Sequence, residues 1–221
     1  MRRSENHSIK NIIDDLKFVD SLKFKMPGRY PKIGTIRQRE ILEKMFAAHK
    51  KIADYSDEDG NPFYYRTSGG RYFNVITVYP TGSSQETSYF VDKRFTKIIA
   101  AILSTSLFWF YQQAYTDGLH IKHTEIDSVP LFDLEKLSAE EMAAVAVLYD
   151  EYLTDIERNV SIRTSSATSS YNVAQFKNYK LVKSKALIDK LDDVLGKFYG
   201  LTDEEINFVK NFELEFRLSG A

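Results

Sequence analysis

Two histidines lie close enough together in this sequence to share a ligand. His120 and His123 are three positions apart, and two imidazoles at that spacing can bind one metal ion. No third ligand of the usual kind accompanies them. We therefore expect these histidines to lie at the surface or to face phosphate, and we predict no metal site.

A second candidate for catalysis is a carboxylate followed by lysine. Some nucleases use one acidic residue and then an acid-x-Lys pair to hold a metal ion and orient water. Asp15-Leu16-Lys17 supplies only the second half of this pattern, on an expected helix. The many carboxylates of residues 140–157 recur where an amphipathic helix places its polar side.

A third candidate is the tetrapeptide Asn61-Pro62-Phe63-Tyr64. It resembles the Asn-Pro-Pro-Tyr signature with which amino-methyltransferases hold a flipped adenine, where an aromatic ring stacks on the base. Here the second proline is missing, and no preceding strand with a Gly-rich turn is present to hold S-adenosylmethionine. We interpret the tetrapeptide as a loop that enters a strand.

Other catalytic classes are excluded by composition. The 221 residues include no cysteine, which rules out disulfides, thiolate catalysis and cysteine-bound zinc. The sequence also has no G-x-S-x-G elbow, no phosphate-binding G-x-x-x-x-G-K-[ST] loop and no G-x-G-x-x-G motif.

The net charge of −1 conceals a segregation of charge along the chain. Residues 1–52 carry 13 basic and 6 acidic side chains, and residues 126–160 carry 2 basic and 9 acidic ones. Residues 161–183 carry 4 basic side chains and no acidic one. Such asymmetry can mark a surface that faces a polyanion, so the balanced total does not argue against nucleic acid.

The sequence predicts neither a signal peptide nor a membrane span. Residues 1–5 are polar, and a signal peptide needs an apolar region. The apolar stretch of residues 98–115 is interrupted at residues 104–106 and at Gln112-Gln113, so it is too short to span a bilayer. We expect a buried helix there and a cytoplasmic protein that does not contact a membrane.

The first half of the chain is expected to hold two helices, a small sheet and a third helix. Apolar spacing predicts helices over residues 8–23 and, with Thr35 as N-cap, over residues 36–53. The buried side of the second helix is expected to carry Ile36, Ile41, Leu42, Met45, Phe46 and Ile52. The acidic residues 57–62 should form a loop.

Aromatic and β-branched runs follow this loop. They predict a hairpin of residues 63–66 and 71–79 around Gly69-Gly70, a third strand at residues 88–91, and a continuous helix over residues 93–115.

The second half is expected to be helical. Ser138 and Glu141 have the spacing of a capping box before a helix that ends near residue 159. Residues 161–172 are rich in Ser and Thr and should form a flexible loop. Further helices are expected over residues 183–199, with Gly200 as C-cap, and from a second capping box at Thr202 to residue 211. This order predicts an α+β fold, with a first region of residues 1–135 and a helical region of residues 136–221.

Several of these segments together resemble a known family. Residues 30–34, 64–73, 98–111 and 120–130 are similar to the C-terminal target-recognition region of type II restriction–modification adenine-specific DNA methyltransferases. Residues 183–189, 199–208 and 212–217 resemble the end of that region. The match covers most of residues 30–217 in order. It departs from the family in lacking the methyltransferase core and in having His123 at an Arg-like position.

The resemblance implies a sequence-specific DNA recognition module that is non-catalytic by itself. Its partners would be double-stranded DNA and a methyltransferase catalytic domain or subunit, and S-adenosylmethionine would bind only to that catalytic part. Guanidinium groups beside a Gly-Gly turn can pair with guanine, and loop side chains can meet phosphate or bases. The expected DNA-binding residues are Arg66, Gly69, Gly70, Arg71, Ser83, Ser84, His120, Lys122 and His123.

Two alternatives stay open at this point. The chain could be a minimal methyltransferase or nuclease that uses Asn61 or Asp15, in which case it would bind S-adenosylmethionine or a metal ion itself. It could also be an interaction module that docks through the acidic helix of residues 138–159 to a separate catalytic subunit.

Overall fold

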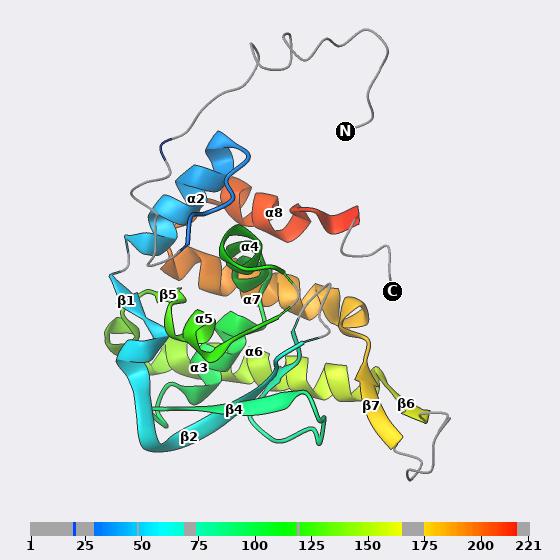
Figure 1. Ribbon diagram of the computed structural model, residues 1–221. Helices are drawn as coiled ribbons and strands as arrows, with labels where there is room; N and C mark the ends of the chain where they lie inside the picture. Colours follow the sequence, from blue (N-terminus) through cyan, green and yellow to red (C-terminus); the bar gives the residue numbers. More distant parts are fainter. Residues whose placement is uncertain are drawn as a thin grey trace, which may run out of the picture.

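The computed structural model describes residue 20 and residues 29–47, 49–68, 74–118, 120–164 and 175–215. In this part of the chain, seven α-helices accompany three small antiparallel sheets, which confirms the α+β class (Figure 1). The expected helix over residues 8–23 and the Gly69-Gly70 turn lie outside the described residues.

The central sheet has three strands in the order β3-β2-β4, with bounds Ile76–Thr77, Ser56–Arg66 and Glu86–Val91. Tyr64 pairs with Thr77 on one side of β2 and with Ser88 on the other. The antiparallel pairing of the expected hairpin and the expected third strand are therefore confirmed. The second strand of the hairpin is much shorter than predicted.

The acidic residues 57–62 do not form a separate loop, so that prediction was wrong. They belong to β2, but the register of the strand is interrupted there, because Ser56 and Asn61 both pair with Val91. The intervening residues bulge outward while the chain stays extended on both sides. Pairing with β4, which follows much later in the sequence, makes this polar run part of a strand.

Helix α2 spans Ile36–Phe46 and is shorter than predicted. Thr35 is its N-cap as expected, because its side chain accepts a hydrogen bond from the Gln38 amide. The helix cannot continue past His49, whose φ of 56° is left-handed. A short strand, β1 (Lys50–Lys51), follows and pairs with β5 (Pro130–Leu131).

The burial prediction for this region was mostly right. Ile41, Leu42 and Met45 are buried, and Ile52 is buried in the 3-10 turn η2 (Ile52–Tyr55) and not in the helix. Ile36 is 44% exposed, so its predicted burial was wrong.

The expected helix over residues 93–115 is broken into α3 (Thr96–Leu103) and α4 (Ser106–Tyr115). Thr105 is extended between them and caps α4, because its hydroxyl accepts from the Phe108 amide. The carboxylate of Asp192 accepts from the Ser106 and Leu107 amides at 3.2 and 3.1 Å. These acceptors satisfy the amides at the start of α4, and so stabilise a break that apolar spacing does not reveal.

The predicted helix starts and stops of the second half are largely confirmed. The helices after α4 are α5 (His123–Asp127), α6 (Ala139–Arg158), α7 (Lys185–Phe198) and α8 (Asp203–Asn211), with a 3-10 turn, η3 (Leu134–Lys136), before α6. Capping boxes close at Ser138 with Glu141 and at Thr202 with Glu205. Gly200 follows α7 with a φ of 71°, the left-handed conformation that ends many helices.

The prediction of a flexible loop at residues 161–172 was wrong at its start. Residues 160–164 form β6 (Val160–Thr164), which pairs over its whole length with β7 (Gln175–Tyr179). The 3-10 turn η4 (Leu181–Ser184) then leads into α7. The rest of the expected loop lies outside the described residues.

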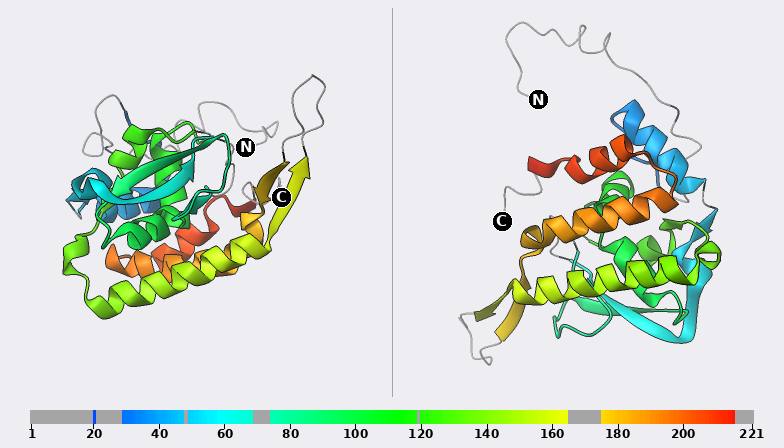
Figure 2. Two further views of the ribbon diagram at one scale, coloured as in Figure 1. Left: turned by 90° about the horizontal axis from the view of Figure 1, so that it is seen from below. Right: turned by 180° about the vertical axis from the view of Figure 1, so that it is seen from behind.

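Figures 1 and 2 show α6 and α7 side by side behind the central sheet, with α3 between α6 and the strands, while α4 packs against α7 and α8. One hydrophobic core connects these layers, from Leu42 of α2 through Phe63 and Tyr89 of the sheet to Leu191 of α7. The core therefore includes residues from both expected regions of the chain. This packing fixes the loops at one end of the sheet, where the candidate site lies.

Candidate nucleic-acid interface

Three segments that are far apart in the sequence meet at the end of β2. Thr67 donates its amide to the Gln85 carbonyl at 2.8 Å, and its own carbonyl accepts from the Ile121 amide at 3.1 Å. Ser68 forms an isolated antiparallel bridge with His120, and its hydroxyl donates to the Gln85 side chain at 2.9 Å. The structure thus brings the loop of residues 80–85 and residues 117–123 together around Thr67 and Ser68.

His120 is exposed at this junction and is held by Asp117. The His120 amide donates to one carboxylate oxygen of Asp117 at 2.8 Å, and the imidazole Nδ1 lies 2.8 Å from the other. Both side chains are more than half exposed. The position of the ring is therefore fixed from its own loop, which leaves the ring open to a ligand outside the protein.

Lys122 and His123 begin helix α5. Lys122 is the N-cap, and its amide donates to Glu125 Oε2 at 3.0 Å. The lysine side chain is exposed at the start of the helix. His123 stacks on Tyr89 of β4, with the ring centroids 4.5 Å apart and an interplanar angle of 26°. Its side chain remains 62% exposed, and its Nδ1 lies 3.5 Å from Asp127. The imidazole is thus a positioned, solvent-facing donor.

Tyr89 is rigid support for His123. Its hydroxyl donates to Asp127 Oδ1 at 2.6 Å, and its ring stacks on Phe63 at a centroid distance of 5.4 Å. Burial and the nearby Asp127 carboxylate raise the pKa of Tyr89 well above its usual value. The same causes, with Glu125 added, raise the pKa of Tyr65 to about 12. Both tyrosines are therefore neutral packing groups here, and Tyr89 is also a hydrogen-bond donor.

Arg66 lies differently from its expected place beside a base. Its guanidinium donates to the Lys177 carbonyl of β7 at 3.1 Å and lies 5.2 Å from the centroid of the Tyr179 ring. The side chain is half-buried, and this burial lowers the pKa of Arg66. Arg66 thus connects β2 to β7, while Arg71, Gly69 and Gly70 lie outside the described residues.

Ser83 and Ser84 lie in the loop between β3 and β4, as expected. The Ser83 carbonyl accepts from the Glu86 amide at 3.1 Å, and its hydroxyl accepts from the Gln85 amide at 3.3 Å. Ser84 is exposed. Glu86 ties the loop from the other end, because its carboxylate accepts from the Thr81 amide at 2.9 Å. The loop is therefore well ordered by its own hydrogen bonds.

Two further cations reach this region from the basic N-terminal segment. Arg29 lies 3.6 Å from Glu125 of α5, and Lys32 donates to the Thr116 carbonyl at 2.6 Å. The Lys32 amide also donates to the Ala114 carbonyl at 2.8 Å. Neither residue was singled out from the sequence, although both belong to the segment whose excess of positive charge was recognised.

The alternative catalytic residues are not supported by a built site. Asp15 lies outside the described residues, and Asn61 is exposed at the register interruption of β2. Asn61 and Pro62 line an open groove of about 710 Å³ with mostly apolar neighbours from α3, η3 and α6, away from the residues described above. Among the described residues, no group of three His, Asp or Glu side chains is arranged to hold a metal ion.

No helix within the described part of the chain is long and apolar enough to cross a bilayer. Comparison of the sequence and structure with models of protein families, with curated proteins and with solved structures found no match.

Proposed function

We propose that this chain is a sequence-specific DNA recognition module of an adenine-N6 methyltransferase or restriction–modification enzyme, and that it is non-catalytic by itself. The observation that supports this most is the meeting of residues 80–85 and 117–123 at the end of β2. Residues 120–123 belong to a segment that resembles the family's recognition region, and Ser83 and Ser84 were expected in a loop able to meet phosphate or bases. The two segments are separated by more than thirty residues in the sequence. Residues that read one duplex must lie on one face.

The chemistry of the exposed groups also suits a nucleic acid. His120, Lys122 and His123 provide N–H donors, and Ser84 provides a hydroxyl. Such groups bond to phosphate oxygens and to the acceptor edges of bases. His123 is held by stacking and His120 by two contacts with Asp117. Donors fixed before binding lose little freedom on binding.

Acidic side chains lie among these donors and reduce the electrostatic attraction of this surface for DNA. Asp117 and Asp127 contact the two histidines, and Glu125 contacts Arg29. A surface with interspersed carboxylates attracts DNA less than a uniformly basic one. Specific contacts, and a catalytic domain that holds the other face of the duplex, would therefore contribute much of the affinity.

The test selects bound duplexes from a library with a randomised centre and then measures binding by fluorescence anisotropy. We expect one preferred sequence. His123→Ala should cost about 1–3 kcal/mol at one or two base pairs and leave the others unchanged. Lys122→Ala should weaken binding to all duplexes and reduce the slope of log K against log salt by about 1.

Lys136→Ala is the matched control, because this lysine is 82% exposed and lies in η3, outside the interface. It should leave affinity and sequence preference unchanged. If the chain enriches no sequence from the library, or if the three variants behave alike, the proposal is wrong.

A docking role through α6 has one observation in its favour. Val147 is 61% exposed on a helix face that also carries Glu140 and Glu151. Reversing the charges of Glu140 and Glu151 should then abolish co-purification with a catalytic subunit while DNA binding by the chain persists. Glu141 is unsuitable for this test, because it closes the capping box with Ser138.

A further inference from the structure

The hairpin of β6 and β7 stands out from the rest of the molecule, next to the candidate interface. Figures 1 and 2 show it projecting beyond the ends of α6 and α7. In the described part of the chain, its two strands pair only with each other. We call β6, β7 and residues 180–183 the β6–β7 arm.

The base of the arm is fixed to the body by a polar cluster around Glu157 of α6. Its carboxylate accepts from Tyr179 at 2.6 Å, from Lys177 at 2.9 Å and from Tyr79 at 3.1 Å. Burial alone would raise the pKa of Glu157, but these hydrogen bonds together lower it. The carboxylate is therefore charged at neutral pH and holds three elements together.

Arg66 connects the same base to the candidate interface. It donates to the Lys177 carbonyl of the arm and lies over the Tyr179 ring, while Thr67 and Ser68, the next residues, hold residues 80–85 and 117–123. The arm thus begins directly beside the segments that are proposed to read DNA. Its direction is set by contacts that are already formed in the unbound protein.

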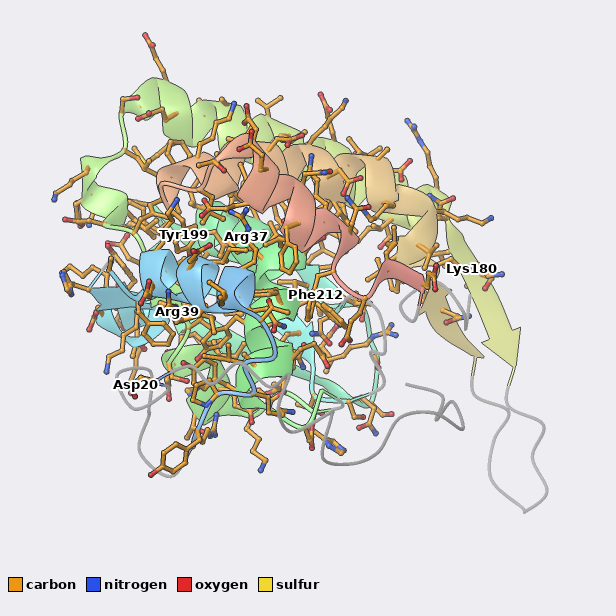
Figure 3. The ribbon with its side chains drawn as sticks, turned by 90° about the horizontal axis from the view of Figure 1, so that it is seen from above. Asp20, Arg37, Arg39, Lys180, Tyr199 and Phe212 are labelled. Atoms are coloured by element: carbon orange, nitrogen blue, oxygen red, sulfur yellow. The ribbon has the colours of Figure 1, made fainter. Side chains whose placement is uncertain are left out.

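The charge of the arm is of one sign. From residue 160 to residue 183 the sequence has four basic residues and no acidic one, namely Arg163, Lys177, Lys180 and Lys183. Lys180 and Lys183 are exposed, and Figure 3 shows Lys180 at the edge of the molecule beside the base of the hairpin. Neither of these two lysines forms an ion pair with a described residue, whereas Lys177 pairs with Glu157. Unpaired lysines on a projecting element fit a polyanion.

We infer that the β6–β7 arm contacts the phosphate backbone of duplex DNA bound at the candidate interface. This inference rests on the proposed function. Phosphate contacts fix the position of a protein on the duplex without reading sequence, so the arm, like Lys122, would supply register and affinity while His120 and His123 supply preference. Ile162 of β6 is exposed, and neither β6 nor β7 has an acidic residue that would repel the backbone.

The test compares the full chain with the double variant Lys180→Ala/Lys183→Ala on labelled duplexes of preferred and unrelated sequence. Counterion release predicts that the slope of log K against log salt falls by about 2, and that affinity at about 0.1 M salt falls roughly tenfold per lysine. The loss should be equal for both duplexes, because phosphate contacts carry no sequence information. Lys180→Arg/Lys183→Arg should bind like the unaltered chain.

The matched control is Lys136→Ala/Lys197→Ala, which also removes two positive charges. Lys136 lies in η3, and Lys197 lies at the C-terminal end of α7, whereas the arm precedes the N-terminal end of α7. Both double variants change exposed residues, and thermal unfolding should confirm that they fold. If the arm variant binds with the same affinity and salt slope as the control, the inference is wrong and the recognition module stands. If the unaltered chain binds no duplex at low salt, both the module and the arm are wrong.

Discussion

Arg66 illustrates how one side chain can be chemically right for DNA and yet be used inside the protein. The sequence places it just before a Gly-Gly turn, where a guanidinium can pair with guanine. If Arg66 read a base, Arg66→Ala would cost about 1–3 kcal/mol of binding free energy at one base pair. The structure gives the same guanidinium a carbonyl acceptor and an aromatic ring on β7.

We therefore expect Arg66→Ala to lower the free energy of unfolding by about 1–3 kcal/mol, because it removes a charged hydrogen bond and a cation–π contact. Urea denaturation measures this loss. Arg37→Ala, at an exposed arginine of α2, is the control and should change stability by much less. A stable Arg66→Ala variant whose preference changes at one base pair would restore base reading as the role of Arg66.

At the scale of elements, a buried carboxylate helps to stabilise the break between α3 and α4. Asp192 of α7 is only 2% exposed. Burial raises the pKa of Asp192 to about 6, although the hydrogen bonds from Ser106 and Leu107 act in the opposite direction. In the unfolded chain the same group has its ordinary pKa near 3.8.

This difference predicts a pH dependence of stability. The folded protein binds the proton more tightly than the unfolded chain, so the contribution of Asp192 is fully present below about pH 4 and is lost as pH rises through about 6. The total change is about 3 kcal/mol. Denaturation of wild type and Asp192→Asn between pH 4 and 7 should show this slope only in the wild type. Parallel curves for the two proteins would contradict the prediction.

The same break shows which parts of the fold can be predicted from the sequence. Capping boxes at Ser138 and Thr202 depend on residues three positions apart, and both were found correctly. The start of α4 is stabilised by Asp192, which follows Ser106 by 86 residues. The strand on both sides of residues 57–60 depends on Val91, with which Ser56 and Asn61 pair. Local signals are readable in one sequence, whereas a pairing partner far along the chain is not.

The candidate site was predictable to a similar degree. The sequence correctly predicted that Ser84 and His120 lie in loops. It did not predict that these two loops contact the same end of β2. The position of Arg66 was not foreseeable, because its acceptor lies 111 residues away. Arg29 and Lys32 could have been found by asking which cations of the basic segment lie between its two expected helices.

For the whole molecule, the shared core bears on the predicted boundary between residues 135 and 136. The Tyr149 hydroxyl of α6 donates to the Ile76 carbonyl of β3 at 3.1 Å. Phe208 and Phe212 contact Phe110 of α4. Residues 1–135 therefore need the later helices to cover α3 and α4.

We expect a fragment of residues 1–135 to aggregate when it is expressed alone, because it would expose a large apolar surface. Co-expression with residues 136–221 should restore a stable complex that elutes at the size of the full chain. The measurement is size-exclusion chromatography of both preparations. A monomeric first fragment with cooperative thermal unfolding would instead show that the boundary separates independent domains.

The bulge in β2 has a practical consequence for such experiments. Ser56 and Asn61 pair with the same residue, Val91, and residues 57–59 are exposed. Extra residues inserted between them would lengthen the bulge without shifting the register of the strand on either side. Gly60 must be kept, since a Cβ there would collide with the Val91 carbonyl at 1.9 Å. The position before Gly60 is thus suited to carrying a fluorophore or an affinity tag on the intact protein.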